Sequence, residues 1–242
     1  MVDWKTFFQE YRIIDIKGDA DLLFQVGATV GGKPVSREQF DTIILSIEQG
    51  LKLSDNDSVL DLCCGNGVIT FEIAKKAKKV VGIDSSKPYI DNAVKFKSAE
   101  NISYLTADVT DTDKIIEACP GKLFNKAYCY ASIAYLLPGD LEKLFLLFNK
   151  ISGAKFSFML GSVLDRQRKW HFFNTFRRRV HYLIGYKLLG RDFGVGRWWT
   201  KKEIETIAKR HKYICRFIEQ DKSLHTAHYR FDAVISKAGT DS

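Results

Sequence analysis

The stretch that decides the fold of this 242-residue chain reads Val59-Leu60-Asp61-Leu62-Cys63-Cys64-Gly65-Asn66-Gly67. Its apolar first half predicts a buried strand, and the glycines at its end let the backbone turn sharply and approach a ligand, because they carry no Cβ. The helix that follows begins beneath this turn, which suits a nucleotide-like ligand. Asp61 would repel a pyrophosphate but can pair with an amino group. Thr70 stands where a dinucleotide-binding turn has its third glycine. The stretch therefore disfavours a dinucleotide.

Outward from this stretch, short apolar runs alternate with helical stretches, a pattern typical of βα units around a parallel sheet. The predicted strands of this alternation are residues 58–62, 79–83, 102–105, 126–130 and 154–160. Helices are predicted over 140–151 and 200–211, and two closing strands, 214–219 and 230–236, are predicted to form a hairpin. The pattern indicates an α/β fold with a doubly wound sheet.

Two further carboxylates stand at the ends of the next strands. Asp84 ends the second strand, directly before Ser85, and can accept hydrogen bonds from both hydroxyls of a ribose. Asp108 ends the third strand and can accept from the exocyclic amine of adenine, while Val109 packs near the ring. Three acidic residues at three successive strand ends are a more specific signal than one glycine turn, because ligands of doubly wound sheets bind at this edge.

Together these residues resemble the class I S-adenosylmethionine-dependent methyltransferase family, of the small-molecule type, from about residue 40 to the C-terminus. The resemblance implies a Rossmann-like seven-stranded, mostly parallel sheet with an antiparallel last strand, and S-adenosylmethionine as cofactor. Cys63 stands where the family often has the first of three glycines. Cys129, Tyr130 and Tyr135 match positions that often face the methionine end or the substrate. The cofactor-binding residues implied are Asp61, Cys63, Gly65, Asn66, Gly67, Asp84, Ser85, Asp108, Val109, Cys129 and Tyr130.

A methyl acceptor with an oxygen nucleophile usually needs a general base. Because the resemblance places the final strand antiparallel between the fifth and sixth strands, the link between the last two strands should reach the carboxyl edge. His225 and His228 lie in this link, and they are candidates for a substrate contact or a base, against a purely structural role. Asp165, just past the fifth strand, and Tyr135 are comparable candidates.

Metal and disulfide chemistry are not expected. The two histidines have no suitably spaced acidic or cysteine partner in their segment, and the five cysteines form no Cys-x-x-Cys pair.

A basic and aromatic insertion is predicted at 161–198, and it resembles a helical substrate cap. From Arg166 to Arg191 there are eight basic residues and no acidic one. This charge indicates either an anion-binding surface or a solvated helical face. Residues 1–54 are predicted to form a helical cover or lid, and residues 55–242 the S-adenosylmethionine-binding catalytic domain that carries the cap.

The sequence thus predicts S-adenosylmethionine-dependent O- or N-methylation of a small, anionic or sugar-bearing acceptor. Two alternatives stay open: an RNA methyltransferase that uses the basic region 166–191, and a catalytically silent cofactor-binding scaffold. Because the chain has no signal-peptide pattern and no apolar run of roughly 18–20 residues, a soluble cytoplasmic protein without a membrane span is expected. The acceptor atom, the use of a base and the oligomeric state are left open.

Overall fold

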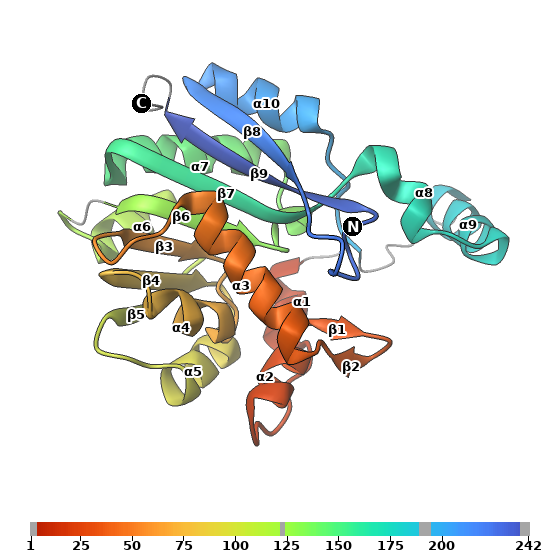
Figure 1. Ribbon diagram of the computed structural model, residues 1–242, viewed down its shortest axis with the longest axis horizontal. Helices are drawn as coiled ribbons and strands as arrows, with labels where there is room; N and C mark the ends of the chain where they lie inside the picture. Colours follow the sequence, from red (N-terminus) through yellow and green to blue (C-terminus); the bar gives the residue numbers. More distant parts are fainter. Residues whose placement is uncertain (1–3, 122–123, 189–194, 238–242) are drawn as a thin grey trace.

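The computed structural model describes residues 4–121, 124–188 and 195–237, which are built around a seven-stranded sheet (Figure 1). The strands are β3 (Ser58–Leu62), β4 (Lys79–Asp84), β5 (Ile102–Thr106), β6 (Phe124–Tyr130), β7 (Ser152–Leu164), β8 (Tyr213–Glu219) and β9 (Arg230–Lys237). Their order is β5-β4-β3-β6-β7-β9-β8, and β9 is antiparallel to both of its neighbours. The predicted mostly parallel sheet with an antiparallel last strand is confirmed.

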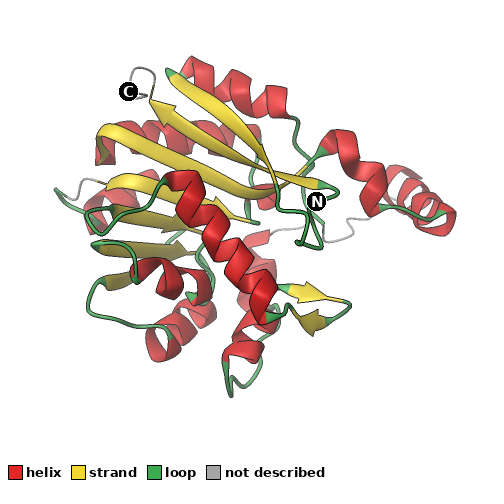
Figure 2. Ribbon diagram, viewed as in Figure 1, coloured by secondary structure: helices red, strands yellow, loops and turns green. Residues whose placement is uncertain are grey.

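Helices cover both faces of this sheet (Figure 2). One face carries α3 (Arg37–Leu51), α4 (Val68–Ala74) and α5 (Lys87–Phe96), and the other carries α6 (Thr112–Ala118), α7 (Pro138–Ile151) and α10 (Lys201–Arg210). Side chains of β3 alternate between the two layers: Val59 packs into the α3 side, whereas Leu60 and Leu62 pack into the α7 side. Burial on both faces explains why the strand is almost continuously apolar.

The predicted strands agree with the observed ones to within about two residues at most ends, but β7 continues past the predicted end at residue 160 to Leu164. It does so because β9 extends the pairing through Val163 and Leu164 after an irregularity that follows Leu160. Ser162 lies in this irregularity with a φ of 58°. The first four residues of the predicted insertion therefore belong to the sheet.

The N-terminal segment consists of α1 (Trp4–Glu10), α2 (Asp19–Gln25) and a small hairpin of β1 (Thr29–Val30) and β2 (Lys33–Pro34), followed by α3. It lies at the edge of the sheet where β3, β4 and β6 end. The three helices of this segment lie within residues 1–54, where helices were predicted. The division of the chain after residue 54 remains a prediction.

After β7 the chain leaves the sheet through η2 (Arg166–Arg168), α8 (Lys169–Phe172), α9 (Phe176–Tyr182) and the wider helical turn η3 (Leu183–Leu188). We call residues 166–188 the basic projection, because these helices stand away from the sheet in Figure 1. Phe173 and Tyr182 anchor it by packing with Trp198 and Tyr229. Among the described residues, no helix has the length and hydropathy needed to cross a bilayer.

Candidate active site

A cavity of about 560 Å³ lies at the carboxyl edge of the parallel strands. Its walls come from the residues that follow β3, β4, β5 and β6, from the irregularity in β7, and from the link between β8 and β9. The N-terminal segment supplies the remaining wall. Nine of the predicted site residues line it, namely Cys63, Gly65, Asp84, Ser85, Asp108, Val109, Tyr130, Tyr135 and His225.

Asp84 forms the best-defined carboxylate of the cavity wall. Its Oδ2 accepts a hydrogen bond from the backbone N–H of Gly65 at 2.9 Å, and its Oδ1 accepts from that of Ser86 at 2.8 Å. Gly65 has a φ of 58°, which glycine adopts without a steric penalty. Burial raises the pKa of Asp84, and the two backbone donors oppose that rise. The turn after β3 and the end of β4 are thus joined through one carboxylate.

The end of β5 supplies the second acidic side chain of the wall. Asp108 Oδ1 accepts hydrogen bonds from the backbone N–H and the hydroxyl of Thr110, both at 2.8 Å. Val109 is buried beside it, and all three residues line the cavity. Thr110, two residues further along the chain, therefore helps to orient this carboxylate.

Four of the predicted cofactor residues lie behind the wall rather than on it, namely Asp61, Asn66, Gly67 and Cys129. Asp61 is buried, and its Oδ2 accepts from the hydroxyls of Thr70 and Tyr128, both at 2.6 Å. Burial raises its pKa to about 7, although the two hydroxyls oppose the shift. Asn66 donates to the Leu22 carbonyl at 2.8 Å and so ties the turn to α2.

Cys63 occupies the glycine-like position of the turn with a φ of 59°. Its thiol contacts Cys129 on β6, and this hydrogen bond together with burial raises the pKa of Cys63. The turn therefore keeps the left-handed backbone that a glycine would give, and the side chain fills the space between β3 and β6. Gly67, with a φ of 75°, begins α4.

The opposite end of the cavity holds a cation that the sequence analysis missed. Arg230, the first residue of β9, donates from Nη1 to the carbonyl and the hydroxyl of Ser162, each at 3.1 Å. Its buried Nε has no hydrogen-bond partner among the described residues. Asp232 accepts from the Ser162 N–H at 2.7 Å and so fixes the strand irregularity that presents these acceptors. The predicted link ended one residue before Arg230.

His225 lines the same end and is half-buried. Gln39 of α3 donates from Nε2 to the Ser223 carbonyl at 3.0 Å, so its Oε1 faces Nδ1 of His225 at 2.8 Å. Nδ1 must therefore carry the ring proton in the neutral imidazole, which leaves Nε2 as the ring's acceptor. Burial, with the positive charges of Arg230 and His228, lowers the pKa of His225. The imidazole of His225 is therefore uncharged at neutral pH.

The other three predicted catalytic candidates lie in different surroundings. Asp165 is buried outside the cavity wall, where it caps η2 by accepting from the Gln167 N–H at 2.9 Å. His228 is exposed, and its carbonyl accepts from His171 Nδ1 at 2.8 Å. Tyr135 lines the cavity, with its ring 4.6 Å from that of Trp4. The structure brings only His225 and Tyr135 into the cavity.

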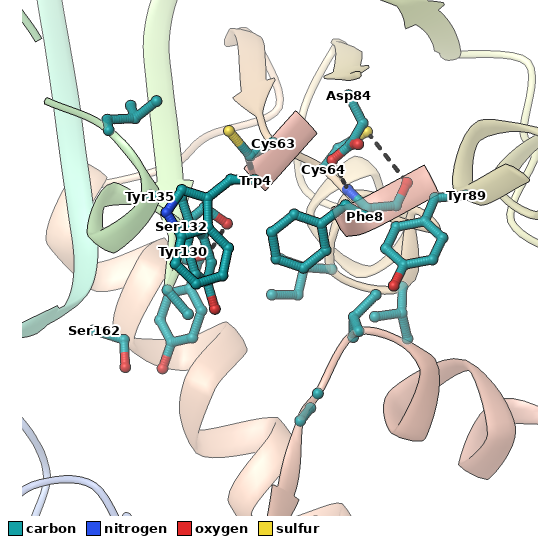
Figure 3. Close-up of a pocket in the computed structure, with 18 of the residues that line it drawn as sticks. Trp4, Phe8, Cys63, Cys64, Asp84, Tyr89, Tyr130, Ser132, Tyr135 and Ser162 are labelled. Carbon is teal, nitrogen blue, oxygen red and sulfur yellow. Dashed lines mark hydrogen bonds between the residues drawn. The ribbon is translucent and has the colours of Figure 1, made fainter. Parts of the chain in front are cut away.

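Aromatic side chains of α1 cover the cavity. Figure 3 shows Trp4 beside Tyr135, and Phe8 between that pair and Tyr89. Two hydrogen bonds hold the helix in place: Gln9 donates to the Ser85 carbonyl and Ser86 donates to the Phe8 carbonyl, both at 2.8 Å. The predicted N-terminal cover thus contacts the end of β4 directly.

Two sequence-based expectations concern metals and the basic region. No group of three or more His, Cys, Asp or Glu side chains in the described part of the chain is placed to hold a metal ion. None of the described residues of the basic projection lines the cavity, so the positive charge at the cavity comes from other segments, including Arg230.

The sheet order and the strand-end carboxylates define the class of protein, a class I methyltransferase fold. Residues 59–151 match the family model described as a methyltransferase domain. Over these residues the chain is similar to S-adenosylmethionine-dependent methyltransferases.

Known proteins resemble it in part of the chain or in fold. A 23S rRNA (uracil(1939)-C(5))-methyltransferase of Psychromonas ingrahamii is 32% identical over 105 residues, which are 42% of this chain and 22% of that protein. A probable cobalt-precorrin-6B C(15)-methyltransferase of Methanococcus vannielii is 37% identical over 71 residues, 29% of this chain and 38% of that one. The chain thus covers well under half of either relative.

Among solved structures, magnesium protoporphyrin IX methyltransferase from Synechocystis, with bound SAH, superposes with a TM-score of 0.60. Its sequence is 12% identical, and the match covers 97% of this chain and 98% of that one. At this identity the likeness concerns the fold, over nearly the whole length of both chains.

Proposed function

We propose that this protein transfers a methyl group from S-adenosylmethionine to a small anionic acceptor held in the cavity. One observation carries the proposal: two strand-end carboxylates, Asp84 and Asp108, and the pair His225 and Arg230 line the same space. The carboxylates can accept hydrogen bonds from the ribose and adenine of a nucleoside. His225 can take a proton from a nucleophile, and Arg230 can bind its negative charge. The coincidence of both sets in one cavity supports a two-substrate reaction.

The residues of the first set fit the cofactor by their chemistry. The carboxylate of Asp84 accepts one backbone hydrogen bond on each oxygen and retains lone pairs for ribose hydroxyls. Asp108 and Val109 offer an acceptor and an apolar surface for adenine. When bound, S-adenosylmethionine supplies an electrophilic methyl group on a sulfonium. Enclosure of the site by Trp4 and Phe8 excludes water from the reacting groups.

The second set recognises and activates the acceptor. Arg230 places a positive charge on the cavity wall, where removal from bulk water strengthens its attraction for a carboxylate or phosphate. His225 takes the proton of an acceptor hydroxyl or amine on Nε2, and Gln39 stabilises the resulting imidazolium through its Oε1. Tyr130, Tyr135 and Tyr229 give the acceptor an aromatic surrounding. A small anion with an O–H or N–H group fits these features.

Titration calorimetry tests the cofactor half of the proposal. S-adenosylmethionine and its demethylated product should bind the wild-type protein and bind Asp84→Asn at least about tenfold more weakly, because charge-assisted hydrogen bonds are lost. Asp55→Asn, at an exposed aspartate, is the matched control and should bind like the wild type. Absence of binding by folded wild-type protein would refute the proposal.

Transfer of a labelled methyl group to a panel of acceptors tests the other half. The panel contains small carboxylates, sugar phosphates, nucleotides, uncharged analogues and RNA. Transfer to small anions is expected. Transfer confined to RNA would favour the RNA methyltransferase alternative, and tight cofactor binding with no transfer to any member would favour the silent scaffold.

A further inference from the structure

The basic projection carries an outward apolar stripe that the fold does not use. Phe176, Val180, Leu183 and Ile184 follow the i, i+4, i+7, i+8 spacing that lines one face of a helix. Phe176 is 83% exposed, Leu183 38% and Ile184 46%, and Trp170 of the neighbouring helix is 42% exposed. Bulky apolar side chains gathered at one protruding site are typical of an interaction surface.

This stripe is separate from the contacts that hold the projection to the domain. Phe173 and Tyr182 point inward and are buried against Trp198 and Tyr229. The ring centroids of Phe173 and Tyr182 lie 4.4 Å apart, and that packing completes the anchor. The exposed stripe therefore contributes little to the fold, and its exposure to water is unfavourable unless a partner covers it.

Cationic side chains flank the stripe. Arg177, Arg178 and Arg179 are all exposed, and none takes part in the ion pairs found among the described residues. No acidic residue occurs between Arg166 and Arg191. Phe173, Arg177, Arg178 and His181 line a shallow hollow of about 380 Å³, a place where a phosphate would meet two guanidinium groups.

We propose that the basic projection docks on the surface of an anionic lipid bilayer, with Phe176, Leu183 and Ile184 in the acyl boundary and the arginines on the phosphate headgroups. A bilayer surface combines dense negative charge with an apolar interior. The arginines of the projection are complementary to the charge, and its apolar stripe is complementary to the interior. RNA fits less well, because aliphatic side chains gain little from bases, which stack on aromatic rings and guanidinium groups. This inference does not depend on methyl transfer.

Vesicle flotation tests the proposal with the 242-residue chain. The wild type should bind phosphatidylcholine vesicles that contain about one-quarter phosphatidylglycerol, and it should bind pure phosphatidylcholine vesicles far more weakly. Raised salt should release it, because exposed charges are screened. The triple variant Arg177→Glu/Arg178→Glu/Arg179→Glu should lose at least about 100-fold in affinity, since each lost cation removes roughly a factor of five and each new carboxylate is repelled by the surface.

Matched control variants distinguish an effect of the basic projection from a general effect of net charge or hydropathy. Lys78→Glu/Lys155→Glu/Lys202→Glu changes the net charge equally at three exposed lysines elsewhere and should bind anionic vesicles much better than the arginine triple variant. Phe176→Ser should weaken vesicle binding about tenfold, because the phenylalanine that enters the bilayer is lost. Leu146→Ser, at a 54% exposed position of α7, should not weaken it. Circular dichroism checks that each variant is folded.

Three results would overturn the proposal. They are absence of wild-type binding to anionic vesicles at low salt, equal losses in the two triple variants, and arginine-dependent binding to single-stranded RNA without binding to vesicles. The last of these would assign the surface to nucleic acid.

Discussion

Asp61→Asn is expected to stabilise the protein increasingly as the pH rises from 5 to 8. The pKa of Asp61 is raised from 3.8 in the unfolded chain to about 7 in the fold, because the side chain is buried. The folded state therefore holds a proton that the unfolded state has released. Stability from this group is fully present below pH 3.8 and is lost as the pH rises to about 7.

The size of the effect follows from the two pKa values. A difference of about 3 pH units corresponds to about 4 kcal/mol at pH 8, of which about 1.5 kcal/mol is already lost at pH 5. Asparagine does not titrate, and its carbonyl oxygen can accept from both Thr70 and Tyr128, as Oδ2 does now. The stability of Asp61→Asn relative to the wild type should therefore rise by about 2.5 kcal/mol between pH 5 and pH 8.

Urea unfolding at several pH values measures this difference, with unchanged m-values as the sign that the unfolding reaction is the same. If the new amide group lowers the free energy of unfolding, it does so equally at pH 5 and at pH 8. The rise in relative stability between these two pH values is therefore unaffected. Asp55→Asn, at an exposed carboxylate, is the control and should show no such rise. A stability difference between Asp61→Asn and wild type that stays constant from pH 5 to pH 8 would refute the reasoning.

Three further predictions concern the acceptor half of the cavity. His225→Gln should lower kcat about 100-fold. In the wild type, kcat should rise with pH across a pKa below 6.5, and this rise should be absent from the variant. Methylation assays at several pH values measure both effects. Arg230→Met should raise KM for an anionic acceptor about tenfold or more, and Arg230→Lys should restore part of it; unchanged KM would exclude the guanidinium from acceptor binding. Gly161→Ala should destabilise the protein by about 1–3 kcal/mol in thermal unfolding, because the new Cβ would lie 2.3 Å from the Tyr130 ring, whereas Gly153→Ala in the same strand meets nothing within 4 Å.

The positions of Asp84 and Asp108 at the cavity could be predicted because the contacts that place them are local in sequence. Asp84 is oriented by Ser86 two residues away and by Gly65 in the neighbouring turn, and Asp108 is oriented by Thr110. Each carboxylate follows directly after an apolar strand, so its place at the carboxyl edge follows from the strand pattern. The strand pattern also predicted a doubly wound sheet, since alternation with helices restricts the topology strongly, whereas the antiparallel last strand was predicted from the family resemblance.

The length of β7 could not be predicted in this way. Gly161 and Ser162 interrupt the apolar run, and Ser162 adopts a positive φ that only the pairing with β9 explains. The basic and aromatic insertion was predicted to form a substrate cap. Its anchoring through Phe173 and Tyr182 joins distant segments, and no described residue of the basic projection lines the cavity, so the cap stays a prediction.

The proposed acceptor half of the cavity, with His225 and Arg230, depends on contacts between distant segments. Gln39 orients His225 across 186 residues of sequence, and Ser162 holds Arg230 across 68. Ser36 caps α3 by accepting from the Gln39 N–H at 3.3 Å, and the Gln39 side chain contacts the β8–β9 link. Because the acceptor half is assembled from α3, β7 and the β8–β9 link, substitutions there can change the acceptor without altering the strand-end carboxylates. On the proposed function, the acceptor can therefore change while the strand-end carboxylates stay the same, so these carboxylates alone do not specify the acceptor.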